Sequence, residues 1–166
     1  MKRRPNYFEK GLKIAIVVLF IAVIASAAIN LYTTGTTQIQ MLGVSLEVPD
    51  DGGFDLESKY NVYSSYIGKD NGWGVTAINV ANVNTTDSKQ NTTLNNFNKA
   101  KNIDVLGNNK DTVEGIQIYK TGSGVVSYFK VNSIDFKVYG DEDTVVSIVN
   151  SIKELNKGST ITFVNF

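Results

Sequence analysis

The sequence contains no cysteine and no histidine among its 166 residues. Without cysteine, the chain has no disulfide, no thiolate nucleophile and no cysteine-linked lipid anchor. Without histidine, it lacks the most common general base and the most common ligand of transition metals. A Ser-His-Asp triad and histidine-ligated zinc or haem are therefore excluded, and no other catalytic motif is present. We expect a non-catalytic protein that has no cofactor.

Arginine is scarce as well, and the charges are unevenly distributed. Arg3 and Arg4 are the two arginines of the chain, and they belong to a cluster of 5 basic residues before residue 14. After residue 32, 11 basic residues stand against 15 acidic ones. Nucleic-acid binding needs a basic surface, so we expect no nucleic-acid partner.

One long stretch, IAIVVLFIAVIASAAINLY at residues 14–32, carries no formal charge. As a helix it would span roughly 28 Å, close to the roughly 30 Å of a bilayer interior. The basic cluster precedes it, which predicts a cytoplasmic N-terminus. We therefore expect a cytoplasmic segment at 1–13, a transmembrane helix at 14–32 and a linker at 33–37. Residues 38–166 would form a domain outside the cytoplasm, with the lipid bilayer as a partner.

Two other interpretations of this stretch stay open. Ala25-Ser26-Ala27 matches the pattern that signal peptidase cuts, so cleavage near Ala27 would release a secreted protein. The apolar residues that continue beyond Ala27 favour a retained anchor. The sequence EKGLKIAIVVLF also resembles the start of a type IV pilin, although Ile16 stands where such pilins usually carry a glutamate.

Small and polar residues recur every four positions within the apolar stretch. Ala22, Ser26 and Asn30 would share one face of the helix. Small residues at this spacing let membrane helices approach closely, and asparagine can hydrogen-bond across the contact. These three residues are candidates for self-association of the membrane helix.

The remainder of the chain shows the alternation that is typical of strands. In LGVSLEVP, Leu42, Val44, Leu46 and Val48 alternate with smaller or polar residues. Asn71-Gly72 lies between two further β-rich segments and predicts a hairpin. We expect strands within residues 42–49, 60–68, 73–83, 113–120, 125–132 and 134–140, and a short final strand within 159–166.

Two helices are expected among these strands. Residues 141–158 have a clear apolar stripe: Val145, Ile148, Val149, Ile152 and Leu155. The polar residues 84–112 give a weaker signal, a short helix from Leu94 capped by Thr92 or Thr93. One-sided alternation indicates a sheet with one covered face, so we expect an α+β fold in which both helices pack on the same face of an antiparallel sheet.

The start of this domain, MLGVSLEVPDDGGF, is similar to that of small anchored proteins of archaea and bacteria with a Mog1/PsbP-like α+β domain. Gly43, Pro49, Gly53 and Phe54 match their pattern, while Leu46 replaces the usual aromatic residue. The resemblance implies the order of strands and helices. It implies no catalytic residue, because these families share none.

A few residues are candidates for modification or binding. Asn84 and Asn91 begin N-x-T sequons and are candidate glycosylation sites. Tyr139 alternates with apolar residues of its strand and is a candidate exposed aromatic residue for contacting a glycan or a protein. Asp135 and the run 141–143 are acidic, but they lack the spacing of a calcium loop, and acids are common where a helix begins. We expect no metal site.

We therefore expect a membrane-anchored domain outside the cytoplasm that binds or scaffolds in the cell envelope, with an envelope protein or a glycan as a possible partner. A secreted or anchored protein that binds a small ligand is the alternative. A pilin-like assembly subunit is the third hypothesis.

Overall fold

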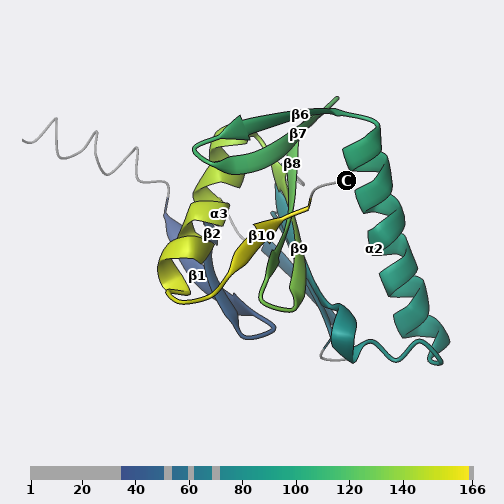
Figure 1. Cartoon of the computed structure of the whole chain (residues 1–166). Coiled ribbons are helices and arrows are strands. Elements are labelled where there is room, and N and C mark those ends of the chain that lie inside the picture. The colour runs from purple at the N-terminus through teal and green to yellow at the C-terminus, as the bar shows by residue number, and fades with distance from the viewer. Residues whose placement is uncertain (1–34, 51–53, 60–61, 69–71, 165–166) are drawn as a thin grey trace, which may run out of the picture. The chain divides into compact units, whose positions relative to one another are not determined.

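The computed structural model describes residues 35–50, 54–59, 62–68 and 72–164. A large antiparallel sheet is the central feature of these residues (Figure 1). Its strands are β3 (Phe54–Lys59), β4 (Tyr63–Gly68), β5 (Gly74–Asn79), β6 (Asn109–Val113), β7 (Ile116–Thr121), β8 (Gly124–Val131), β9 (Ile134–Gly140) and β10 (Ile161–Phe163). They follow one another in the order β3-β4-β5-β9-β8-β7-β6, and β10 also pairs with β8.

The two helices lie on opposite faces of this sheet. Helix α3 (Glu142–Leu155) packs on one face together with a separate hairpin of β1 (Thr36–Met41) and β2 (Val44–Pro49). Helix α2 (Ser88–Leu106) covers the other face, so the sheet runs between the two helices in Figure 1. The α+β class and the antiparallel sheet are confirmed, whereas the expectation that both helices share one face is wrong.

The sheet needs two covers because both of its faces are apolar. In β8, Val125 and Phe129 belong to the core under α3, whereas Val126 and Tyr128 belong to the cluster under α2. Successive side chains of a strand point to opposite faces, so consecutive apolar residues indicate burial on both sides.

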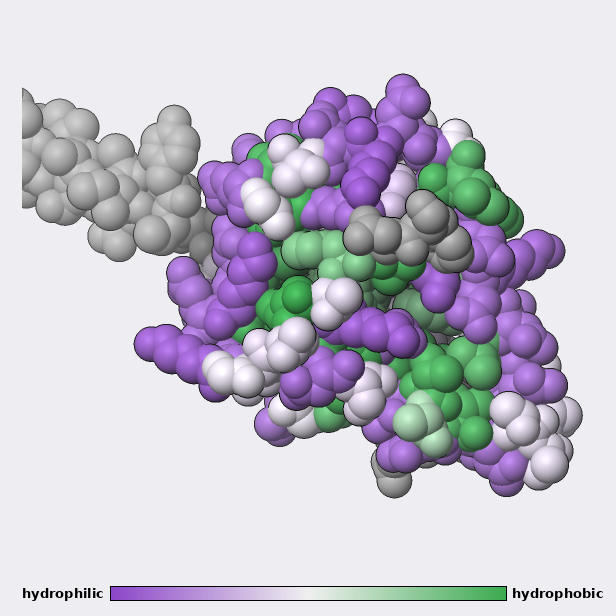
Figure 2. Space-filling model, in the orientation of Figure 1, coloured by the Kyte–Doolittle hydropathy of each residue, from purple (hydrophilic) through white to green (hydrophobic). Residues whose placement is uncertain are grey.

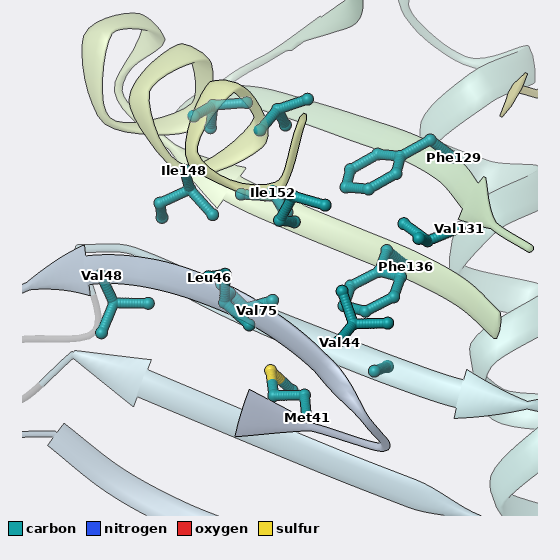
Figure 3. Packing of buried hydrophobic residues seen from close by; sticks show 14 of the residues in the cluster. Met41, Val44, Leu46, Val48, Val75, Phe129, Val131, Phe136, Ile148 and Ile152 are labelled. Carbon is teal, nitrogen blue, oxygen red and sulfur yellow. The ribbon is translucent and has the colours of Figure 1, made fainter. Parts of the chain in front are cut away.

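The α3 face is closely packed. The expected stripe of α3 is confirmed for Val145, Ile148, Val149 and Ile152, which are all buried, whereas its fifth residue, Leu155, is exposed. Side chains from α3, the hairpin and the central strands point into one shared interior (Figure 3). Within this interior the rings of Phe129 and Phe136 stack with centroids 5.5 Å apart.

The hairpin begins earlier in the chain than expected. Strand β1 includes Thr36 and Thr37, two residues that were assigned to the linker. Leu42 and Gly43 form the turn with φ of 51° and 88°, so Leu42 is not part of the alternating strand. Two positive φ angles in succession give the tight turn that matches the twist of a hairpin.

Helix α2 differs from its expectation in both length and start. It has 19 residues and begins at Ser88, capped by Asp87, whose Oδ1 accepts from the amides of Lys89 and Gln90. A short helix from Leu94, capped by Thr92 or Thr93, is therefore wrong. Two of its side chains, Phe97 and Val105, are buried. The helix is held by few apolar contacts, which is why its apolar periodicity is weak in the sequence.

Two strands, β7 and β10, pair with different parts of the same edge of β8. β7 pairs with β8 at residues 124–126, and β10 pairs with the same strand at residues 129–131. Beyond β10, the carbonyl of Val164 accepts hydrogen bonds from Gln117 Nε2 at 2.7 Å and from Tyr119 Oη at 3.2 Å. These two buried side chains of β7 thereby fix the backbone of Val164, the last described residue.

Candidate functional site

A row of polar side chains crosses the sheet under α2. Thr76 of β5 stands opposite Ser65 of β4 on one side and Lys137 of β9 on the other, and Lys137 stands opposite Tyr128 of β8. The hydroxyls of Ser65 and Thr76 are 3.2 Å apart and hydrogen-bond. Most sheet faces that pack against a helix are apolar, so this polar row distinguishes the α2 face from the α3 face.

Asp104 of α2 contacts two residues of this row, Tyr128 and Lys137. Its Oδ2 accepts a hydrogen bond from Tyr128 Oη at 2.7 Å and from Lys137 Nζ at 2.9 Å. Each side chain of the Lys137–Asp104 ion pair is a little over one-fifth exposed. Partial burial reduces solvent screening, so this pair is stronger than one on an open surface. Asp104 therefore joins α2 to the sheet through two charge-assisted hydrogen bonds.

The tyrosines around Lys137 stay protonated. Burial, supported by the hydrogen bond to Asp104 and its negative charge, raises the pKa of Tyr128 far above its ordinary value. Burial also raises the pKa of Tyr139. The Lys137 ammonium lies 5.5 Å from the ring centre of Tyr128 and 5.8 Å from that of Tyr139, within the range of cation–π attraction.

Tyr139, the candidate exposed aromatic residue, is half-buried. Its ring packs in the cluster under α2 and lies across Gly74 of the neighbouring strand. A Cβ at Gly74 would come within 2.5 Å of the tyrosine ring. The glycine therefore provides the space that lets Tyr139 lie flat on the sheet, out of full contact with solvent.

Two clefts open on either side of Lys137. The first, which we call the Tyr139 cleft, has a volume of about 290 Å³ and is lined by Asp104, Thr121, Ser123, Lys137 and Tyr139 among others. The second, the Phe97 cleft, has a volume of about 270 Å³. Its lining is formed by Tyr63, Thr76, Thr93, Asn96, Phe97, Ala100 and Lys137. Lys137 is the one residue that lines both.

Both sequons lie near the start of α2, in different settings. Asn84 is exposed in the loop before the helix, where its Oδ1 accepts from the amide and the hydroxyl of Thr86 at 3.0 and 2.7 Å. Asn91 is half-buried within α2, and its Oδ1 accepts from Asn95 Nδ2 at 3.4 Å.

Two acidic residues of the C-terminal half, Asp135 and Asp141, have different surroundings. Asp135 is 5% exposed on β9, and its Oδ1 lies 3.6 Å from Lys130 Nζ. Asp141 caps α3, accepting from the amide of Thr144 at 2.9 Å and from its hydroxyl at 2.7 Å. Across residues 35–50, 54–59, 62–68 and 72–164, no three acidic side chains come together as ligands for a metal ion.

The expected membrane helix at 14–32, with its candidate contact residues Ala22, Ser26 and Asn30, lies outside the described residues. Within the part of the chain that the structure does describe, no helix is both long enough and apolar enough to cross a membrane.

Sequence reasoning missed Asp104 and Lys137. They are 33 residues apart and belong to no motif, and Lys137 looks like an ordinary outward residue of the strand IDFKVYG. A usable signal lies in β8, where the apolar run VVSYF implies that the second sheet face is covered too. A lysine on that covered face needs a partner, because burying an unpaired charge is costly.

Comparison with known proteins adds no relative to this description. No family model matches the chain, and neither a curated protein nor a solved structure matches it.

Proposed function

We propose that the chain is a membrane-anchored binding protein. Residues 14–32 anchor it, and the α+β domain lies outside the cytoplasm and binds a small molecule between α2 and the sheet. The observation that carries this proposal is the pair of clefts of about 290 and 270 Å³ that flank Lys137. Both volumes lie just below the range of roughly 300–1,000 Å³ that is typical of ligand sites, so each cleft suits a small ligand.

The contrast between the two sheet faces supports this assignment. On the α3 face, apolar side chains from the helix, the hairpin and the sheet fill the interior. On the α2 face, six buried residues form a smaller cluster, and polar groups border both clefts. A surface that serves stability alone is best filled with apolar side chains, whereas convergent polar groups beside a cavity are typical of a binding site.

The chemistry of the site favours binding over catalysis. Tyr128 donates its hydroxyl proton to Asp104, and the Lys137 ammonium donates to the same carboxylate oxygen. An ammonium has no lone pair with which to attack a substrate, and a tyrosine with a raised pKa is a poor acid or base near neutrality. These groups are suited to holding a ligand and α2 in place.

A second candidate function is docking of an envelope protein at the C-terminal end of α2. Ile103 is 60% exposed and Leu106 is 74% exposed, one helical turn apart. In Figure 2 hydrophobic surface appears at the upper right, where this end of α2 lies in Figure 1. Contiguous apolar surface commonly marks a contact site.

The anchor is tested by measuring the intact mass of the protein from a carbonate-washed membrane fraction. A full-length mass in the membrane pellet is expected. A mass that begins after Ala27, found in the soluble fraction, would overturn the anchor and make the protein a secreted one. A mass that begins at Leu12 would leave residues 14–32 in the protein but would favour the pilin-like subunit over both the anchored binding protein and the secreted one.

Ligand binding is tested on the full-length protein in detergent by a thermal-shift screen of small acids, sugars and amines. Compounds that bind the domain under α2 should raise the unfolding temperature, and replacing Ala100 of the Phe97 cleft by tryptophan should remove the effect for those that bind there. Ala100→Ser is the matched control, because it leaves the cleft open. Ser123 lines the Tyr139 cleft, so Ser123→Trp should fill that cleft in the same way. Compounds that raise the unfolding temperature equally in wild type, Ala100→Trp and Ser123→Trp would contradict the proposal.

A further inference from the structure

We propose that the Phe97 cleft binds a small organic anion, a carboxylate or phosphate group attached to a flat apolar body, with Lys137 as its counter-ion. This inference rests on the proposed function and specifies the ligand class at that site. It is carried by the distribution of charge, of hydrogen-bonding groups and of aromatic rings around one cleft.

The charge of the cleft has one sign. Among the described residues that line it, Lys137 is the cationic one and none carries a carboxylate. Asp104 lines the Tyr139 cleft on the other side of Lys137, so the two clefts differ in the charge that they present to a ligand. An anion that enters the Phe97 cleft meets the ammonium without facing an acidic side chain of the lining.

Lys137 keeps hydrogen-bonding capacity for such a ligand. An ammonium has three donors, and among the described residues its hydrogen-bond acceptor is Asp104 Oδ2 at 2.9 Å. Thr76 stands directly across from Lys137 on β5 and lines the same cleft. Asn96 approaches from α2, where it is exposed, so the cleft is accessible from solvent. Lys137 and these neutral groups can together surround an anionic oxygen.

The aromatic side chains define the other part of the ligand. Tyr63 and Phe97 line the cleft, and Phe97 meets the Tyr128 ring edge to face at 6.0 Å and 82°. Phe97 is 6% exposed, so its position is fixed by packing. Fixed rings favour a flat apolar group beside the anion, because stacking and edge contacts need planar partners.

Asp104 is the built-in competitor of this ligand. It already neutralises the ammonium, and any anion in the cleft shares Lys137 with it. Removing the charge of Asp104 should therefore strengthen anion binding, even though it weakens the attachment of α2. A purely structural ion pair predicts the opposite, because loss of either partner would then only loosen the helix.

The test uses the full-length protein in detergent, with benzoate and inorganic phosphate as probes and benzyl alcohol as the neutral analogue of benzoate. Amide chemical shifts should change at Thr76, Asn96 and Lys137 on titration with benzoate, and benzyl alcohol should bind more weakly. Lys137→Gln should weaken benzoate binding about tenfold or more, since hydrogen bonds to charged groups are the stronger ones. Lys137→Arg should restore most of the affinity.

Two further variants complete the test. Asp104→Asn keeps an acceptor for Tyr128 and should tighten benzoate binding by up to about tenfold, the effect of one charge contact. Lys99→Gln, an exposed lysine of α2, carries the same change of charge and should leave the affinity unaltered.

The proposal is overturned by equal binding of benzoate and benzyl alcohol, by Lys137→Gln binding as wild type, or by no shift with either anion. If neutral compounds bind and Ala100→Trp abolishes their binding, the proposed function would stand, but the ligand would not be an anion. Circular dichroism of each variant verifies that it is folded before its affinity is compared.

Discussion

Asn156 forms a two-way hydrogen bond with the backbone of Ser45, at the other end of the described chain. The amide of Ser45 donates to Asn156 Oδ1 at 3.1 Å, and Asn156 Nδ2 donates to the carbonyl of Ser45 at 2.7 Å. Two residues further along β2, the amide of Glu47 donates to Ser151 Oγ at 2.9 Å. These side chains of α3 and of its C-cap satisfy the edge of β2 that β1 leaves unpaired, in the manner of a neighbouring strand.

Asn156→Asp should destabilise the protein by about 1–3 kcal/mol, because it places a carboxylate against two carbonyl oxygens that Nδ2 now serves, those of Ser45 and Ile152. The shape of the side chain is unchanged, so the effect reports on the lost donor. Urea unfolding measures it. Asn150→Asp in α3 is the control, because Asn150 Nδ2 donates to Glu114 Oε2 at an exposed position; an equal loss in both variants would contradict the edge-pairing role.

Gly74→Ala should cost about 1–3 kcal/mol, the range for inserting an atom into a packed site. The new Cβ would clash with the ring of Tyr139, which must then leave its half-buried position. Gly72→Ala is the matched control, because no atom lies within 4 Å of its Cβ position. In a double-mutant cycle, the cost of Gly74→Ala should shrink in a Tyr139→Ala background; strict additivity would show that the two residues do not interact.

Stability should fall steeply when the pH rises above 10. Tyr128 has an ordinary pKa of 10.0 that the fold raises, so above that pH the unfolded chain releases a proton that the folded chain retains. The unfolded state then binds fewer protons, and stability decreases with increasing pH. Urea unfolding at about pH 8 and about pH 11 should show this decrease, and Tyr128→Phe should reduce the decrease. Equal pH dependence in wild type and variant would mean that Tyr128 ionises normally.

Helix α2 should exchange its amide hydrogens faster than α3. Four side chains of α3 are buried in the main core, whereas two are buried from the longer α2. Local opening costs less where fewer apolar contacts are lost. Hydrogen exchange followed by mass spectrometry compares the two helices, and Asp104→Ala should accelerate exchange in α2 without changing α3. Similar protection of both helices would contradict a loosely held α2.

The sequence predicted α3 well because an amphipathic helix over a large core carries its own periodicity. Val145, Ile148, Val149 and Ile152 lie on one face at helical spacing and face the core. Helix α2 has no such pattern, since its attachment depends on Phe97, Val105 and the ion pair of Asp104. Its start was also misplaced, because Asp87 competes as a cap with several threonines in the same polar segment.

The site could not be read from the sequence because its members meet only through the topology. Lys137 and Tyr128 lie opposite each other in β9 and β8, and Asp104 arrives from a helix that precedes both strands. The placement of the helices failed for a related reason: alternation in β9 indicated one covered face, whereas the paired apolar residues of β8 indicate two.

Asn84 should carry a glycan when the full-length chain is produced in a cell with N-glycosylation machinery, and Asn91 should not. Asn84 is exposed in a loop, whereas Asn91 is half-buried in a helix, and the transferase needs an accessible surface segment. The intact mass should increase in wild type and in Asn91→Gln, and return to the unmodified value in Asn84→Gln. The prediction assumes that the domain lies outside the cytoplasm and that exposure decides which sequon is modified. A further sequon appended after Phe166 tests these two assumptions separately. If the appended sequon is modified and Asn84 is not, the accessibility argument is wrong; if neither is modified, the domain does not lie outside the cytoplasm.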